Sequence, residues 1–431
     1  MDAVPLDILT CPFCRGDLVE KGSSLVCPEG FHFSMLGGII DLYMPRCRCG
    51  GVFRPVSENQ GIVLSCEMCH DTVEAKDRMK DEQSPEEREL YVPREKTSVE
   101  SEWDEAAKHY WTLPLAASKS VREEIFDNVQ DEIVLDMGAG LGLWLHYLQD
   151  VLDASSRMVA VDISRPMLEK AREGIMDPAR LCDSLEFSIS LPQIVGSDDL
   201  LSRIIFVRAD AERSPFKDNV FDSCISFQAL QYTNQRTSIS QLLRVTKPGG
   251  RLVIGTQPGS EACGYLVYDC DISRVQKPKL REGLRKQFEV FDRFVEWFKN
   301  EYPGESRLFH EGWTTSPKHP VDLFLDKEKG RISEEEFLSG IKDWREKTQR
   351  PLDPTKHSCC YGEKRFTKMV KDISTTRKSK VLEAGIKTIP LEEAHQLDPE
   401  KSKNINLEDS WDYGMYLHFY GVRYAVIQKE E

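Results

Sequence analysis

The sequence predicts an α/β protein with a doubly wound, mostly parallel sheet, a cysteine-rich N-terminal module and a mostly helical insertion after the fifth strand. Three observations predict this fold. A glycine-rich turn follows a short apolar strand at 133–137, strand and helix patterns alternate as far as residue 258, and seven of the 13 cysteines lie between residues 11 and 69. A chain of 431 residues exceeds the usual size of one domain. We therefore expect a metal-binding module (1–73), a charged linker (74–105), a core (106–258), a helical insertion (259–363) and the C-terminal part of the core (364–431).

The composition of the chain limits which binding partners and which cellular location we expect. The formal net charge is −15, whereas a protein that grips nucleic acid through its phosphates usually has a broad basic face. Basic runs at 274–286 and 364–380 keep RNA open as a partner. The sequence has no run of about 18 apolar residues and its first residues lack a signal-peptide pattern, so we expect a cytoplasmic protein without a membrane span.

The first cysteine set has the spacing of a zinc site. Cys11 and Cys14 form a CxxC pair, followed by Cys27 and His32. Zinc is held by four nitrogen or sulfur ligands at tetrahedral corners, and a short hairpin between the two ligand pairs is typical of a zinc ribbon. His32 is the weakest predicted ligand, because Gly30 stands where a second CxxC pair would place its cysteine. The alternative is a group of buried cysteines without metal.

A second cysteine set follows the first. Cys47 and Cys49 form a tight CxC pair, and Cys66 and Cys69 form a regular CxxC pair. We predict a second zinc ion here, so that two ions are expected per chain. Two alternatives stay open, namely that these thiols carry no metal and that His70 replaces one of them.

The glycine turn and the strand ends predict a nucleotide-type cofactor site. In "LDMGAGLG", Asp136 ends the first core strand and three glycines follow at alternate positions, which lets the backbone turn sharply and approach a ligand: Gly138, Gly140 and Gly142. The next strand ends at Asp162, whose carboxylate can accept both ribose hydroxyls of a nucleoside. The third strand ends at Asp210, placed to accept an adenine amino group. A dinucleotide site is the alternative reading of the glycine turn alone.

This series of motifs resembles the class I S-adenosylmethionine-dependent methyltransferases, of the kind called methyltransferase type 11-like. "LDMGAGLG", "AVDIS", "ADAERSPF", "FDSCIS" and "KPGGRLVI" occur in the family's order between about Ile133 and Pro258. The resemblance implies a Rossmann-like, seven-stranded sheet, an enzyme, and S-adenosylmethionine as cofactor. It implies that Asp136 and the glycines hold the methionine end of the cofactor. The implied cofactor-binding residues are Asp136, Gly138, Gly140, Gly142, Asp162, Ile163, Asp210, Ala211 and Phe227.

The N-terminal segment carries a second resemblance. "ILTCPFC" through "CPEGFHFSMLGGIIDLY" resembles the zinc-ribbon module related to the activator subunit of tRNA and protein methyltransferases, and the zinc finger of bacterial ribosomal RNA guanine-N1 methyltransferases. The inserted Phe31 and the second cysteine set depart from that pattern. The resemblance implies a role for the module in recognising substrate or in docking a protein partner.

The sequence assigns no catalytic residue. Methyl transfer from a sulfonium needs little beyond alignment of an activated nucleophile. Gln228 and Tyr232 follow the fourth strand and are candidates for substrate contact. For the remaining candidates, ordinary packing or exposure is the favoured reading: Trp103, Tyr110, Trp111, His310, His319, His357, Cys359 and Cys360.

The favoured function is methyl transfer to a small or lipid-like acceptor, with the insertion covering the substrate. One alternative is a ribosomal or transfer RNA methyltransferase that uses the zinc ribbons for recognition. A second alternative is a non-catalytic partner subunit with a vestigial methyltransferase fold.

Overall fold

The structure, a computed structural model, describes residues 6–43, 53–58, 61–66, 70, 72–74, 76–79, 88–91, 103–104, 107, 118–129, 132–148, 152–153, 155–176, 198–256, 275–303, 320–348, 363–408, 413, 416–417 and 420–430. Within these residues, no helix is both long and apolar enough to cross a bilayer.

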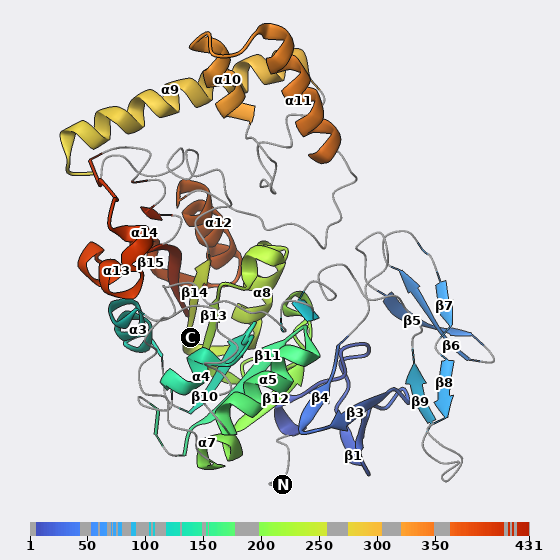
Figure 1. The fold of residues 1–431 in the computed structure, drawn as a ribbon. Coiled ribbons are helices and arrows are strands. Elements are labelled where there is room, and N and C mark those ends of the chain that lie inside the picture. Colours follow the sequence, from blue (N-terminus) through green and yellow to red (C-terminus); the bar gives the residue numbers. More distant parts are fainter. Residues whose placement is uncertain are drawn as a thin grey trace.

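One large sheet dominates the structure (Figure 1). Its strand order is β1-β2-β3-β4-β12-β11-β10-β13-β14-β16-β15. The strands from β4 to β14 are parallel to one another, and β16 is antiparallel to both of its neighbours. The core strands are β10 (Ile133–Met137), β11 (Arg157–Asp162), β12 (Ile204–Arg208), β13 (Phe221–Phe227), β14 (Thr246–Thr256), β15 (Ser379–Thr388) and β16 (Gly421–Lys429).

The N-terminal module extends the sheet of the core strands β10–β16, so that the whole sheet has eleven strands. Its strands are β1 (Val19–Lys21), β2 (Ser24–Val26), β3 (His32–Leu36) and β4 (Ile39–Asp41), and β4 pairs in parallel with β12. An unpaired β12 would present a row of free backbone groups at the sheet edge. The sequence pattern alone does not indicate which core strand the segment 39–41 joins.

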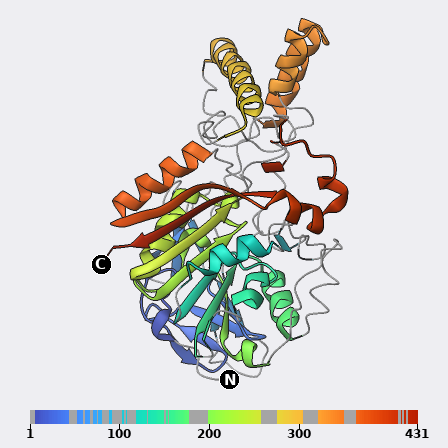
Figure 2. The same cartoon turned by 90° about the vertical axis from the view of Figure 1, so that its left-hand side faces the viewer.

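Helices cover both faces of the sheet, as a doubly wound fold requires. Figure 2 shows α8 (Gln235–Val245) and α12 (Glu363–Thr376) on one face, and α4 (Leu143–Leu148) and α5 (Arg165–Met176) on the other. Successive strand residues point to opposite faces. Accordingly, Leu135 belongs to the apolar cluster beneath α8 and α12, whereas Val134 belongs to the cluster beneath α4 and α5.

Shorter elements complete the core. They are η1 (Leu6–Ile8), α3 (Lys119–Phe126), α7 (Asp198–Ser202), η2 (Ala211–Arg213), η3 (Leu230–Tyr232), α13 (Leu391–Leu397) and α14 (Pro399–Ser402). Two small antiparallel sheets follow β4 in the chain and lie on the side of the N-terminal strands that faces away from the core (Figure 1). They contain β5 (Phe53–Glu58), β6 (Gly61–Cys66) and β7 (Thr72–Glu74), and β8 (Lys76–Met79) and β9 (Arg88–Tyr91). The expected linker, 74–105, therefore contains a β-hairpin.

Three helices follow β14 in the segment expected to be an insertion: α9 (Pro278–Glu301), α10 (Pro320–Glu328) and α11 (Glu334–Thr348). They share an apolar cluster of their own, which includes Phe294, Phe298 and Phe337. Figure 1 shows them beyond the end of the sheet at which β14 finishes. Leu280 and Leu284 of α9 pack with Leu417, which connects this helical segment to the C-terminal part of the core.

Candidate cofactor and metal sites

The glycine turn lies directly beyond β10. Gly138, Gly140 and Gly142 have φ angles of 81°, 52° and 75°, which glycine adopts without the strain of a side chain. The amides of Gly138 and Ala139 donate to the carbonyl oxygen of Val161 at 2.7 and 2.9 Å, so the turn is tied to β11. At Gly138 the close approach is to the protein itself, because a Cβ there would lie 2.1 Å from the Cβ of Ala229.

Asp136 is a buried carboxyl with only 1% of its surface exposed. Neither of its oxygens has a hydrogen-bond partner within the described part of the chain. Burial and, to a smaller extent, the nearby charge of Asp162 raise the pKa of Asp136 to about 8. Buried polar atoms in proteins are normally hydrogen-bonded. A cationic donor, such as the ammonium group of S-adenosylmethionine, fits these two oxygens.

Asp162 is held from both sides at the end of β11. Its Oδ2 accepts the amide of Gly140 and its Oδ1 accepts the amide of Ser164, both at 2.9 Å. Burial raises the pKa of Asp162 to about 6, although these backbone hydrogen bonds lower it. The residue is partly exposed, and each carboxylate oxygen has lone pairs left for the hydroxyls of a ribose.

The residues predicted to bind the adenine lie at the neighbouring strand end. Asp210 follows β12 and is buried, with 4% of its surface exposed. Its Oδ1 caps η2 by accepting the amide of Glu212 at 2.9 Å. Ala211 begins η2 and is partly exposed, as is Ile163 in the turn beyond β11. Phe227 ends β13 and packs on Trp144 of α4, with ring centroids 4.8 Å apart.

The segment before the core bridges two loops at the same edge of the sheet. Asp104 accepts the hydroxyl of Ser164 at 2.6 Å, and Trp103 lies edge-on to Tyr232, with centroids 4.8 Å apart. Sequence reasoning did not single out Ser164 or Asp104. A serine before an Arg-Pro pair is a helix N-cap pattern that marks Ser164 in retrospect, and its hydroxyl does accept the amide of Met167.

Two glutamines lie beyond β13, where substrate contact was predicted. Gln228 has a left-handed backbone with φ of 58°, and its amide donates to the carbonyl oxygen of Gly255 at 2.8 Å. The Nε2 of Gln231 donates to the backbone carbonyl of Gln228 at 3.0 Å. Within the described residues, the buried Nε2 of Gln228 and Oε1 of Gln231 have no hydrogen-bond partner. Substrate contact by Gln228, and by Tyr232 in η3, stays a prediction.

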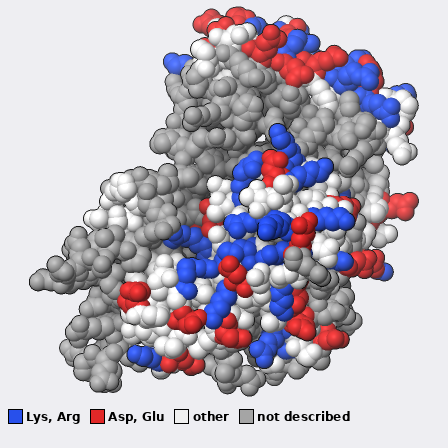
Figure 3. All heavy atoms as spheres, turned by 180° about the vertical axis from the view of Figure 1, so that it is seen from behind, with Lys and Arg blue, Asp and Glu red and all other residues white. Residues whose placement is uncertain are grey.

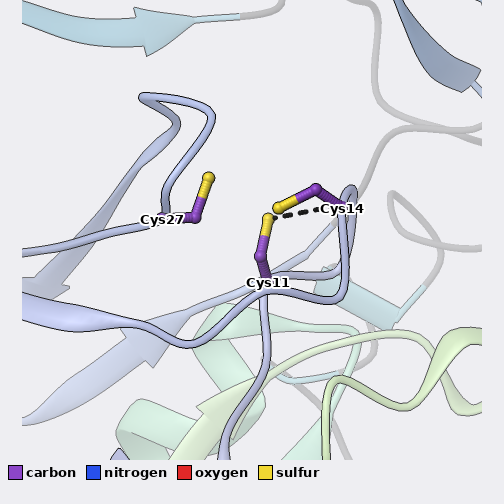
Figure 4. Close-up of side chains that lie close together, drawn as sticks. All are labelled: Cys11, Cys14 and Cys27. Atoms are coloured by element: carbon purple, nitrogen blue, oxygen red, sulfur yellow. Dashed lines mark hydrogen bonds between the residues drawn. The ribbon is translucent and has the colours of Figure 1, made fainter.

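Three of the predicted metal ligands come together in the N-terminal module (Figure 4). The Sγ atoms of Cys11, Cys14 and Cys27 lie within 4.8 Å of one another. The amides of Phe13 and Cys14 donate to Sγ of Cys11 at 3.4 and 3.5 Å. Burial raises the pKa of the Cys11 and Cys27 thiols, so thiolates at this place need a compensating cation.

This group fits zinc through three thiolates, and no fourth ligand is gathered with them among the described residues. His32 does not belong to the group among the described residues; it begins β3, opposite Val26. The loop after Cys27 turns at Gly30, whose amide donates to the carbonyl of Cys27 and whose φ is 82°. His32 therefore stays a prediction as a ligand.

The second cysteine set is described only in part. Cys47, Cys49 and Cys69 lie outside the described residues, while Cys66 is buried at the end of β6. The amide of His70 donates to the carbonyl of Cys66 at 3.0 Å, and His70 has φ of 61°. Arg15 has the same relation to Cys11, with 2.9 Å and 62°. The hydrogen bond and the backbone conformation of His70 thus match those of Arg15 after the first CxxC pair, and His70 is exposed.

Several weaker candidates also fall outside the described residues, and their roles stay predictions: Tyr110, Trp111, His310, His319, His357, Cys359 and Cys360.

A parallel sheet with a glycine turn and carboxylates at consecutive strand ends defines a nucleotide-type cofactor site. Residues 135–254 match the family described as "Methyltransferase domain". The chain therefore contains a class I S-adenosylmethionine-dependent methyltransferase domain.

Curated relatives match over the same part of the chain. The "Ubiquinone/menaquinone biosynthesis C-methyltransferase UbiE" of Wigglesworthia glossinidia brevipalpis is 29% identical over 125 residues, which are 29% of this chain and 42% of the relative. The protein of that name from Pseudomonas fluorescens (strain SBW25) is 32% identical over 122 residues, 28% of this chain and 40% of the relative. The chain thus spans about two fifths of the length of these relatives.

Solved structures are also similar to this chain. One is a complex between the Haloferax volcanii Trm112 methyltransferase activator and a putative methyltransferase, with 15% identity, a TM-score of 0.39, and coverage of 78% of this chain and 98% of that chain. Another is a geranyl diphosphate methyltransferase in complex with GPP and sinefungin, with 10% identity, a TM-score of 0.35, and coverage of 72% of this chain and 78% of that chain.

Proposed function

We propose that the protein transfers a methyl group from S-adenosylmethionine to a small, largely apolar acceptor. The observation that carries this proposal is Asp136, a buried carboxyl with two unpartnered oxygens beside the glycine turn. Asp162, with Ile163, would bind the ribose, and Asp210 with Ala211 would bind the adenine. Bound cofactor would supply an activated methyl group on its sulfonium. The chain's own residues would orient that group toward the acceptor and exclude water.

The chemistry beyond β13 supports an acceptor with an aromatic or extended apolar surface. Trp103 and Tyr232 form one aromatic contact and Trp144 and Phe227 form another. Aromatic side chains provide large apolar contact area with defined geometry. The curated relatives are named as C-methyltransferases of ubiquinone and menaquinone biosynthesis, which is consistent with a quinone-like ring. Gln228 and Gln231 would offer the few polar contacts that orient such a ring.

Zinc is proposed as a structural metal of the N-terminal region. The three gathered thiols support one ion, and the hydrogen bond and backbone conformation of His70, which match those of Arg15, support a second. Neither site is assigned a step of the reaction. A protein partner bound through this region is also a proposal.

RNA is the second candidate acceptor, favoured by one surface feature. Figure 3 shows a band of Lys and Arg side chains on the face seen from behind. Exposed cations of α8, α12, the turn after α12 and the start of β15 include Arg236, Lys368, Lys371, Arg377, Lys378 and Lys380. Asp372 forms an ion pair with Arg236 at 3.9 Å. Such a local basic face suits a polyanion even though the whole chain is acidic.

The two acceptor classes are separated by labelling. Purified protein with S-adenosylmethionine carrying a tritiated methyl group is incubated with fractionated cell RNA, protein and lipid or small-molecule pools. We expect label in the small-molecule or lipid pool. Label in RNA, lost when Lys371 and Lys378 are both changed to Glu, would favour the second candidate. Label in no pool, with cofactor bound normally, would favour a non-catalytic subunit.

A further inference from the structure

The N-terminal module meets the core at the strand ends that carry the ribose side of the cofactor site. β4 pairs with β12, and β12 pairs with β11. The register places Asp41, Arg208 and Asp162 side by side, each as the last residue of its strand. An arginine from the core therefore lies between a carboxylate of the module and a carboxylate of the cofactor site.

Arg208 connects the module to the turn beyond β11. Its Nη1 lies 3.1 Å from Oδ2 of Asp41, and its Nε donates to the carbonyl oxygen of Ile163 at 3.0 Å. The side chain of Arg208 is only 14% exposed and that of Asp41 only 21%. The guanidinium carbon of Arg208 lies 4.7 Å from the centroid of the Tyr43 ring. Since the guanidinium is a rigid planar fork, anchoring one of its nitrogens on Asp41 fixes the direction of the other.

The carbonyl oxygen that accepts this hydrogen bond from Arg208 belongs to Ile163, the residue directly after Asp162. The carboxylate of Asp162 accepts hydrogen bonds from the amides of Gly140 and Ser164. Its position therefore depends on the backbone of this turn. A second contact of the module reaches the same place, because Arg165, the first residue of α5, donates to the carbonyl oxygen of Leu36 at 2.9 Å. The module thus contacts the turn both through Arg208 and at the start of the following helix.

From this juxtaposition we propose that Asp41 and Arg208 are positioning residues, through which the N-terminal module orients Asp162 toward the ribose of the cofactor. Neither side chain is assigned a contact with the cofactor. The inference rests on the proposed function and deepens it, because it gives the module a role in cofactor affinity and not only in recognition of the acceptor.

The test is cofactor binding by the full-length protein, measured by titration calorimetry with S-adenosylmethionine. Asp41→Asn keeps the shape of the side chain and removes its charge. We expect about tenfold weaker binding of S-adenosylmethionine. That loss corresponds to about 1.4 kcal/mol. Asp41→Glu, which restores the charge, should recover part of the affinity.

A matched control uses another ion pair between the same module and the core. Oδ1 of Asp17 lies 2.7 Å from Nζ of Lys217, so Asp17→Asn removes a charge from the module at a different contact. We expect its affinity for the cofactor to equal that of the wild-type protein. Equal losses in both variants would show a general loosening of the module and would overturn the proposal.

A double-mutant cycle tests whether Asp41 acts through Arg208. Arg208→Lys keeps the positive charge, but one ammonium cannot reproduce the two directed contacts. If Asp41 acts through Arg208, adding Asp41→Asn to Arg208→Lys should weaken binding by less than about twofold more. Fully additive losses, or wild-type affinity in Asp41→Asn, would overturn the proposal. Wild-type protein that binds no cofactor would contradict the proposed function itself. Circular dichroism and melting temperatures verify that each variant is folded.

Discussion

Replacing Asp136 by Asn should stabilise the cofactor-free protein at high pH while it abolishes cofactor binding. The carboxyl is buried and its pKa is raised from 3.8 to about 8, chiefly by burial. In the native state the group is therefore protonated between pH 4 and 8, whereas in the unfolded chain it is ionised. The native protein binds more protons across this window, so the free energy of unfolding falls as pH rises.

The magnitude follows from the size of the shift. One pKa unit corresponds to about 1.4 kcal/mol, so a shift of about four units sets an upper limit of about 5 to 6 kcal/mol between pH 4 and pH 8. Solvent penetration and relaxation reduce this value, and a measured change of about 2 to 4 kcal/mol is expected. The amide that replaces the carboxyl in Asp136→Asn carries no charge at any pH. The variant therefore lacks this contribution to the pH dependence of the free energy of unfolding.

The assay is urea unfolding of cofactor-free wild-type and Asp136→Asn protein at intervals from pH 5 to pH 9. The variant should gain stability relative to the wild-type protein as pH rises, and the difference should level off above pH 8. A second prediction of the same reasoning is that cofactor affinity of the wild-type protein increases with pH toward 8, because a cationic ligand requires the ionised carboxylate. A constant difference in stability across this range would refute the assignment of a raised pKa to Asp136.

The other predictions concern the ribose contact, the glycine turn and the metal sites. Asp162→Ala should weaken S-adenosylmethionine binding by about 1.5 to 3 kcal/mol in calorimetry, the usual contribution of a hydrogen bond to a charged group; wild-type affinity would contradict its role. Gly138→Ala should lower the free energy of unfolding by about 2 to 4 kcal/mol, because the new Cβ would lie 2.1 Å from that of Ala229 at a φ of 81°. Ala229→Gly should restore part of that loss in the double variant, and no rescue would refute the clash as the cause. Elemental analysis should find two zinc ions per chain and one each in Cys14→Ser and Cys66→Ser; loss of both ions in either variant would refute two independent sites.

The order of the core elements was predictable because each strand end carries its own local signal. The glycine turn, the aspartates after β11 and β12, and the Pro-Gly-Gly segment at the start of β14 are each contained in a few consecutive residues. The apolar residues within 291–302 and 332–344 recur at helical spacing, which is also a local signal. These segments lie largely in α9 and α11.

Pairings between distant segments were not predictable in the same way. The attachment of β4 to β12 depends on a sheet edge that no local pattern describes. The Asp41–Arg208 contact depends on that attachment, so the sequence marked neither residue. Asp162 was predicted to bind the ribose from its place at the end of a strand, whereas the residues proposed to orient it belong to other strands and turns.

Binding of cofactor by the purified wild-type chain tests the central claim most directly. Titration calorimetry with S-adenosylmethionine, and in parallel with NAD, distinguishes the methyltransferase site from a dinucleotide site. The account predicts one molecule of S-adenosylmethionine bound per chain, release of a proton on binding below pH 8, and no binding of NAD. Binding of NAD in preference to S-adenosylmethionine, or of neither ligand by folded protein, would contradict it.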